Sequence, residues 1–91
     1  MYRNLNEMEA RILRICKSLE QPFLTIHVVK IANFLSEEYV RYILTSLVDY
    51  GKLVRYRKGR YNVYWLPGRS EQLMKKKVEG LNRNTHATFI R

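Results

Sequence analysis

The chain has 91 residues, of which 46% are hydrophobic and 27% are charged, and a net charge of +9, a composition that predicts one small, basic, folded domain. No stretch approaches the roughly 20 apolar residues that cross a bilayer, and the N-terminus has no apolar segment like that of a secretory signal. These absences argue against a membrane-spanning or secreted protein, so we expect a cytoplasmic one, located in the host cytoplasm if its source is a virus.

A first helix is expected from Asn6 to about Leu19. Asn6 is a good N-cap residue, and Glu9 stands three positions later, where its side chain can bond back to the cap. Pro22 ends the helix, because the residue before a proline disfavours helical geometry and proline has no amide proton. Apolar residues recur at helical spacing and predict one buried stripe: Met8, Ile12, Ile15, Cys16 and Leu19.

Cys16 is the one cysteine in the sequence, so an intramolecular disulfide is excluded. Its place on the apolar stripe is typical of a reduced cysteine that packs as a small apolar side chain. The alternative is a disulfide between two copies of the chain, which a cytosol normally disfavours but which the cells of hyperthermophiles allow. The sequence leaves both interpretations open.

The segment after Pro22 predicts a short extended piece followed by a second helix. Phe23 and Leu24 favour an extended backbone, and Thr25 is a suitable N-cap for a helix over residues 26–33. Four β-branched residues in this range weaken the helix prediction, because such residues favour strands when taken alone. We still predict a helix because of the element that follows.

A third helix over residues 36–50 is the best supported element. Ser36 is a good N-cap residue, and acids occupy the first turn, where they complement the positive end of the helix dipole. Gly51 ends the helix, because glycine adopts the left-handed conformation without a Cβ clash. Apolar residues fall at i, i+3, i+4, i+7 and i+8: Val40, Ile43, Leu44, Leu47 and Val48.

Beyond Gly51 the apolar period changes to two, which predicts a two-stranded ribbon over residues 53–57 and 60–66. Both segments are rich in aromatic and β-branched residues, and Lys58-Gly59 between them is a suitable two-residue turn. That turn sets the register, and the predicted cross-strand pairs are Tyr56 with Tyr61 and Val54 with Val63. We expect the face with these residues and Trp65 to pack on the helices. The other face carries Leu53, Arg55, Asn62 and Tyr64.

The positive charge is concentrated in the ribbon and the chain end. Residues 1–51 hold six Lys or Arg against six Asp or Glu, whereas residues 52–91 hold eleven against two. Protection of an exposed sheet edge does not require five cations without an anion, so we expect the ribbon to meet a polyanion. These five cations alternate with aromatic residues: Lys52, Arg55, Arg57, Lys58 and Arg60.

The remaining sequence predicts a short helix and a loose, basic end. Ser70 is a suitable N-cap for a helix to about Val78, which has only a thin apolar edge, and residues 80–91 are polar and basic. We therefore divide the chain into a domain over residues 1–68 and a C-terminal helix and basic tail over residues 69–91. The second segment is a candidate for dimerisation.

Eleven residues stand in the order of a small packing alanine, a helix cap, core leucines, a glycine and a first wing strand: Ile31, Ala32, Leu35, Ser36, Val40, Leu44, Leu47, Gly51, Leu53, Val54 and Arg55. Over residues 5–66 this pattern resembles winged helix-turn-helix regulators of the MarR, ArsR and PadR kind, including compact ones from archaea and their viruses. The resemblance implies a mainly α fold with a small β-hairpin (α+β), built of three helices, a two- or three-stranded wing sheet and a C-terminal helix.

The resemblance also implies that the third helix enters the major groove of DNA while the wing contacts the neighbouring backbone or minor groove. On a helical wheel, the face opposite the apolar stripe and its flanks hold candidate contacts to base edges and phosphates: Glu38, Arg41, Tyr42, Thr45 and Ser46. The candidate wing contacts are Arg55, Arg57, Lys58 and Arg60.

Glu38 and Asp49 lie on the same face and oppose this interpretation, because an acid beside a phosphate lowers affinity. Either Glu38 accepts a hydrogen bond from a cytosine amino group, or the helix lies less deeply in the groove and the wing supplies most of the affinity. A simpler interpretation of Glu38 is compensation of the helix dipole.

Motifs for catalysis, nucleotide binding and metal binding are absent from the sequence. Gly51-Lys52 lacks the other glycine and the hydroxyl residue of a phosphate loop. His27 and His86 are far apart and have no Cys or His neighbour at ligand spacing. We predict no enzymatic activity, no metal and no cofactor.

The leading hypothesis is a double-stranded DNA-binding transcription regulator that acts as a homodimer, with Cys16 as a candidate link between copies. The alternative is a winged-helix adaptor that binds proteins in a transcription or replication assembly, which the acids of the third helix favour. Binding of single-stranded DNA or RNA is a weaker third hypothesis.

Overall fold

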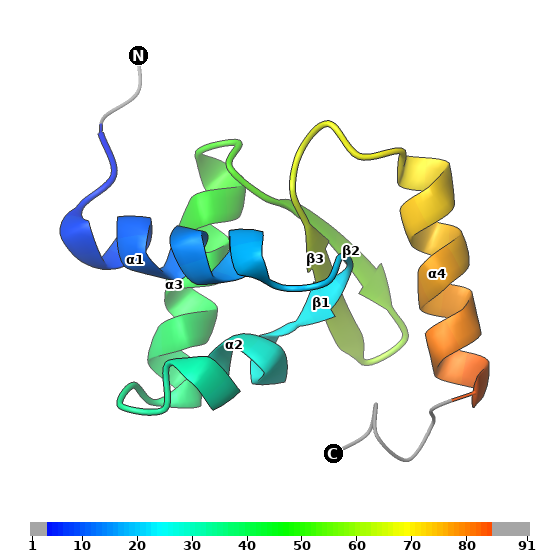
Figure 1. Ribbon diagram of the computed structural model, residues 1–91, viewed down its shortest axis with the longest axis horizontal. Coiled ribbons are helices and arrows are strands. Elements are labelled where there is room, and N and C mark those ends of the chain that lie inside the picture. Colours follow the sequence, from blue (N-terminus) through cyan, green and yellow to red (C-terminus); the bar gives the residue numbers. More distant parts are fainter. Residues whose placement is uncertain (1–3, 85–91) are drawn as a thin grey trace.

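The computed structural model describes residues 4–84, with side chains up to Gly80 (Figure 1). Its strands form one antiparallel sheet in the order β1-β3-β2. The elements in chain order are α1 (Glu7–Ser18), β1 (Phe23–Leu24), α2 (Thr25–Ile31), α3 (Glu37–Asp49), β2 (Val54–Lys58), β3 (Tyr61–Trp65) and α4 (Glu71–Asn84).

The sheet separates two helical layers, with α1, α2 and α3 on one face and α4 on the other (Figure 1). Tyr64 of β3 belongs to the larger layer, where its ring stacks on Phe23 with centroids 5.9 Å apart. Val63, the preceding residue, packs the opposite way against Leu24 and Val78. The main core draws on the first three helices and the sheet: Ile12, Leu13, Cys16, Phe23, Val28, Ala32, Val40, Ile43, Leu44, Leu47, Leu53 and Tyr64.

α1 forms as the sequence predicted. Asn6 Oδ1 accepts from the Glu9 amide at 2.7 Å, while Glu9 Oε1 accepts from the Asn6 amide at 3.0 Å, which is a reciprocal capping box. Cys16 is 0% exposed in the main core. Its sulfur is out of reach of a second chain in this fold, so the proposed disulfide between copies does not fit the structure and a reduced core cysteine does.

A buried side chain that the sequence analysis did not identify connects the end of α1 to the end of β3. Gln21 is 5% exposed, and its Nε2 donates to the carbonyl oxygens of Cys16 and Leu19, both at 2.9 Å. Its Oε1 accepts from the Leu66 amide, also at 2.9 Å. The Cys16 carbonyl also accepts from the Leu19 amide, at 3.2 Å, so Gln21 adds a second bond there and connects the end of the helix to the end of the strand.

α2 begins one residue earlier than predicted. Leu24 is the N-cap residue, and Thr25 is the first helical residue rather than the cap. The Leu24 amide donates to Nδ1 of His27 at 3.0 Å. The side-chain hydrogen bond at the start of the helix therefore comes from a histidine and not from the predicted threonine. α2 ends at Ile31, before the predicted limit.

α3 has the predicted cap, stripe and stop. Ser36 Oγ accepts a backbone amide of the first turn at 3.1 Å. At the other end, Gly51 has a φ of +75°. The amides of Gly51 and Lys52 donate to the carbonyl oxygens of Val48 and Leu47, at 3.0 and 2.8 Å. This pair of bonds is a Schellman motif, which requires the left-handed conformation that glycine adopts here.

The hairpin turns one residue later than predicted. The turn residues are Gly59 and Arg60, and Gly59 supplies the positive φ of +60°. The predicted register is therefore wrong by two residues. The observed pairs are Val54 with Trp65, Arg55 with Tyr64, Tyr56 with Val63, Arg57 with Asn62 and Lys58 with Tyr61.

A displacement by two residues preserves which side chains share a face, but the face assigned to the main core was wrong. The face with Tyr56 and Val63 packs toward α4, whereas the opposite face gives Leu53 and Tyr64 to the main core. The reason is that β3 is apolar on both faces, so alternation alone does not distinguish them.

α4 is longer than predicted. Ser70 caps its start as expected, but residues 80–84, which were expected to be loose, are helical. The other residues of the predicted tail, 85–91, lie outside the described part of the chain. Met74 and Val78 are buried. Tertiary packing of such a thin apolar edge stabilises a helix that would be marginal alone.

α2, the turn after it and α3 form a helix-turn-helix, and β2 and β3 form the wing. The fold is thus the α+β winged helix-turn-helix that the sequence predicted, with β1 as the third strand of the wing sheet. Among the described residues, no helix is long and apolar enough to cross a membrane.

We expect Gln21→Ala to lower the free energy of unfolding by about 2 to 3 kcal/mol, because it removes the side-chain partner of the Leu19 carbonyl and of the Leu66 amide, both half-buried. Urea denaturation followed by circular dichroism measures this. Glu20→Ala changes the exposed neighbouring residue and should stay within about 0.5 kcal/mol of the wild type. Equal effects of the two substitutions would show that the Gln21 hydrogen bonds contribute nothing.

We expect the stability of the protein to fall as the pH drops below about 6.5, the ordinary pKa of histidine. Burial lowers the pKa of His27, the charge of Lys30 lowers it further, and protonation of Nδ1 removes the acceptor for the Leu24 amide. The unfolded chain then binds the proton more readily than the folded one, so stability rises with pH through this window.

An NMR titration of a His86→Gln variant, in which His27 is the remaining histidine, checks this pKa directly. Urea denaturation at pH 5 and pH 7 checks the stability, and His27→Gln should lose this part of the pH dependence. A His27 pKa above 6.5 would contradict the prediction.

Candidate nucleic-acid interface

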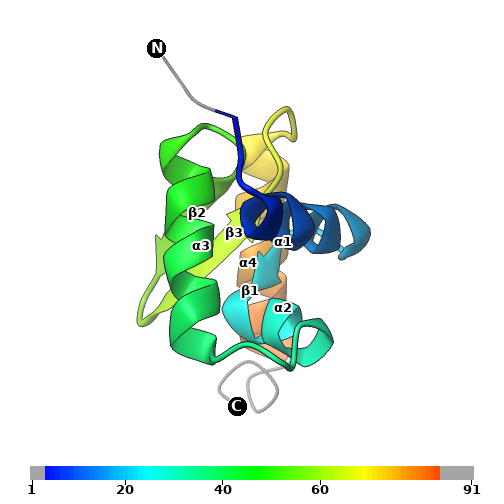
Figure 2. The same cartoon turned by 90° about the vertical axis from the view of Figure 1, so that its left-hand side faces the viewer.

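α3 presents a polar face on the side away from the core. Glu38, Arg41 and Tyr42 are exposed, Tyr42 to 66%, and Thr45 and Ser46 are half-buried. The apolar stripe of the helix lies in the main core. α3 lies along one side of the molecule (Figure 2). The candidate residues of this helix lie outside its buried stripe and share its solvent-accessible face.

Two aromatic side chains extend this face. The rings of Tyr39 and Tyr42 stack with centroids 6.3 Å apart and an angle of 16° between their planes, and Tyr39 is 42% exposed. Residues three apart on a helix are neighbours, so the spacing of these tyrosines was a signal in the sequence. The pair offers a flat apolar surface of the kind that contacts a thymine methyl group.

The charge of α3 is unfavourable for DNA by itself. Its one cation, Arg41, pairs with Glu37 at 2.5 Å on an exposed surface, where such a pair contributes little to stability. Glu38 and Asp49 add two more acids, so the helix carries three acids and one arginine, a net charge of −2. Any attraction to phosphates must therefore come from outside α3.

Strand alternation divides the wing cations into two sets. Arg55 and Arg57 are exposed on the side of the sheet that carries α3, and Arg60 is exposed in the turn. None of these three is in an ion pair within residues 4–84. Figure 2 shows α3 and the hairpin on the same side of the molecule.

A hydrogen bond joins the wing to α3. Arg55 Nη1 donates to Thr45 Oγ1 at 3.2 Å, across ten positions of the sequence. This contact depends on how the hairpin docks on the body, so no local pattern in the sequence indicated it. It makes the outer face of α3 and the wing arginines one continuous surface.

Lys58, a predicted wing contact, lies on the other side of the sheet from these residues. Its ammonium group pairs with Glu79 of α4, and this hydrogen bond raises the pKa of Lys58. Lys75 of α4 lies over the ring of Tyr56, 4.9 Å from its centroid, and pairs with Glu71. The structure therefore separates Lys58 from the surface shared by the other candidates.

Groups suited to covalent or metal chemistry do not accompany this surface. Burial raises the pKa of the Cys16 thiol to about 12, so the thiol stays protonated at neutral pH. In the part of the chain that the structure describes, no group of three or more His, Cys, Asp or Glu side chains could hold a metal ion. That the protein has no enzymatic activity remains a prediction from the sequence.

Comparison with known proteins supports the fold and goes no further. No protein-family model and no curated protein matches the chain. Among solved structures, the chain is similar to the neutron crystal structure of dissimilatory sulfite reductase D (DsrD), with a TM-score of 0.58 and 22% sequence identity, over 70% of this chain and 95% of that chain. At this identity the similarity shows the fold alone, and membership of the MarR, ArsR or PadR regulators stays a prediction.

Proposed function

We propose that the chain binds double-stranded DNA as a transcription regulator, with α3 in the major groove and the wing on the adjacent backbone or minor groove. The observation that carries this proposal is the hydrogen bond between Thr45 and Arg55, which joins the outer face of α3 to the wing arginines. A helix and a hairpin fixed to each other can contact base edges and flanking phosphates at the same time.

In this proposal the wing supplies affinity and α3 supplies selectivity. Arg57 and Arg60 are exposed cations that can neutralise phosphates and release counterions. Tyr42 and Thr45 are placed to contact base edges, and Glu38 can accept from a cytosine amino group. The acids of α3 then act against non-specific binding, because they repel phosphates wherever no matching base compensates.

We also propose that the regulator acts as a homodimer, with the two copies of α3 about 34 Å apart, one turn of DNA. Leu73 of α4 is 49% exposed, whereas Met74 next to it is 2% exposed. α4 covers the face of the sheet opposite the helical body (Figure 1), so a contact between copies through α4 leaves α3 free. Cys16 has no part in this contact.

The salt dependence of DNA binding tests the proposal. If Arg55, Arg57 and Arg60 neutralise about three phosphates per copy, the logarithm of the affinity should fall against the logarithm of salt concentration with a slope of about −2.7 per copy. Arg57→Ala combined with Arg60→Ala should weaken binding and make the slope shallower by about 1.8 per copy. Fluorescence anisotropy with a labelled duplex between about 50 and 200 mM salt measures both.

Arg11→Ala combined with Arg14→Ala is the matched control, because it removes the same charge from the exposed side of α1, across the molecule from α3 and the hairpin (Figure 2). Equal losses from both pairs would show that net charge, rather than the wing, carries the binding. A wild-type affinity for DNA that does not change with salt concentration would contradict the DNA proposal and favour the adaptor hypothesis.

Selection of bound sequences from random duplexes tests the role of α3. Tyr42→Ala and Thr45→Val should each change the preferred base at one or two positions, at a cost of about 1 to 3 kcal/mol for the original site. Arg57→Ala should weaken all sequences to a similar extent and keep the preference. A wild-type chain that enriches no sequence would show that α3 does not read bases.

A further inference from the structure

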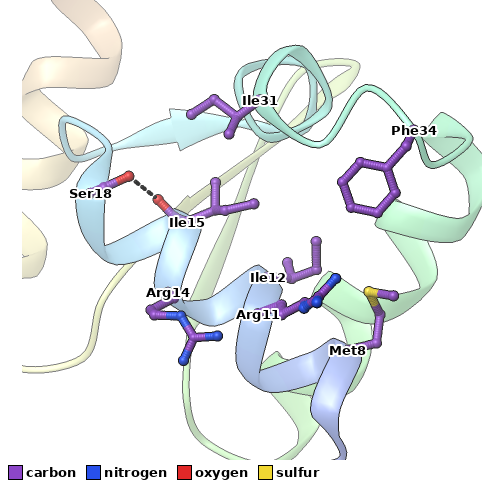
Figure 3. A pocket seen from close by; sticks show the side chains of 8 residues that line it. All are labelled: Met8, Arg11, Ile12, Arg14, Ile15, Ser18, Ile31 and Phe34. Atoms are coloured by element: carbon purple, nitrogen blue, oxygen red, sulfur yellow. Dashed lines mark hydrogen bonds between the residues drawn. The ribbon is translucent and has the colours of Figure 1, made fainter.

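An apolar groove lies between α1 and α2, apart from the proposed DNA surface. It has a volume of about 420 Å³, and Figure 3 shows its side chains converging from α1, from the end of α2 and from the turn before α3. Its lining consists of apolar side chains with two arginines and a serine at the edge: Met8, Arg11, Ile12, Arg14, Ile15, Ser18, Ile31 and Phe34.

The groove exposes large apolar side chains to solvent, which the stability of the fold does not require. Phe34 is 65% exposed and Ile31 is 51% exposed, while Ile12 beneath them is fully buried. Single exposed apolar residues are ordinary, but a contiguous set around a hollow is typical of an interaction surface. Phe34 lies in the turn between α2 and α3, where a polar residue would serve the fold equally well.

The groove faces away from α3 and the wing. In Figure 2, α3 and the hairpin lie on one side of the molecule and α1 and α2 on the other. A molecule in this groove therefore does not compete with DNA for the same surface. Occupation of the groove does not depend on whether the chain binds DNA.

The charge at the edge of the groove indicates the kind of occupant. Arg11 and Arg14 are exposed beside the apolar lining, and neither makes an ion pair with a residue in the described range 4–84. Glu7 precedes Arg11 by one helical turn but does not pair with it. Two unpaired guanidinium groups next to apolar side chains complement carboxylates on an apolar ligand.

We propose that this groove binds an acidic amphipathic helix of another protein, whose apolar side chains at i, i+3, i+4 and i+7 enter the groove while its carboxylates meet Arg11 and Arg14. A second copy of this chain fits less well. In a two-fold contact the same patch meets itself, so the arginines of both copies would come together.

A selection from a displayed library of random helical peptides tests the proposal, with the full chain as bait. Ile31→Ser combined with Phe34→Ser serves as the counter-bait, because it removes the exposed apolar side chains and keeps every charge. Peptides retained by the wild type and lost on the counter-bait should carry both the apolar spacing and an excess of Asp and Glu. Melting curves confirm that the counter-bait is folded.

The affinity of a selected peptide, measured by anisotropy, then tests the arginines. Arg11→Glu combined with Arg14→Glu should weaken binding about tenfold or more. The matched control, Lys76→Glu combined with Lys77→Glu, makes the same change of charge on α4 and should alter the affinity less than twofold. In a ¹⁵N NMR titration with the peptide, the amide chemical shifts of residues near Ile15 and Ile31 should change, and those near Arg57 should not.

Three results would overturn the proposal. Peptides that the counter-bait retains equally well would show that the groove is not the site. Groove-dependent peptides without acidic residues, or equal effects of the two charge variants, would remove the role assigned to the arginines. A wild-type dimer in sedimentation that Ile31→Ser and Phe34→Ser convert to a monomer would identify a second copy as the occupant.

Discussion

The burial of β3 on both of its faces is the constraint on which the rest of the structure depends. Tyr64 points into the three-helix core and Val63 toward α4, and both are at most 1% exposed. Full burial of one such side chain contributes about 1.5 to 3 kcal/mol. A strand held from two sides cannot rotate about its axis, so the paired strand β2 is held as well. The directions of Arg55 and Lys58 follow from this.

The fixed orientation of β3 determines on which face of the sheet each cation of β2 lies. Neighbouring residues of β2 point to opposite faces, so Arg55 and Arg57 lie on the α3 side while Lys58 meets Glu79 of α4. α4 thus supplies the apolar cover for one face of β3 and also a carboxylate for the lysine on that face. The wing arginines on the α3 side make no ion pair within residues 4–84, so a polyanion can reach them together with the helix.

Local signals in the sequence predicted the elements well, because the features that start and stop a helix lie within a few residues. The capping box of Asn6, the cap at Ser36 and the stop at Gly51 all formed as expected. Contacts between distant segments were not predictable in this way. The hydrogen bonds of Gln21 depend on the end of β3, and the role of Lys58 depends on the length of α4.

The sheet faces show why such contacts escape a single sequence. β3 is apolar at successive positions, so the period of two that identifies a strand does not say which side meets the larger core. Only the volume and position of α1, α2 and α3 decide that Tyr64, and not Trp65, joins Phe23. The α3 residues proposed for DNA contact were predictable because their helix has one apolar face. The wing residues were predictable as a group of cations, but the sequence did not show which face of the sheet each of them lies on.

The two proposed surfaces share one buried layer, and this determines how they can influence each other. Ile12 lies at the floor of the groove and belongs to the same core as Leu44 of α3. Coupling between two ligands requires two arrangements of the elements between them and is reciprocal in free energy. A close-packed core of fully buried aliphatic side chains offers one arrangement. An acidic helix in the groove would therefore add a partner to a DNA-bound chain without changing its affinity for DNA, apart from partial neutralisation of the positive charge.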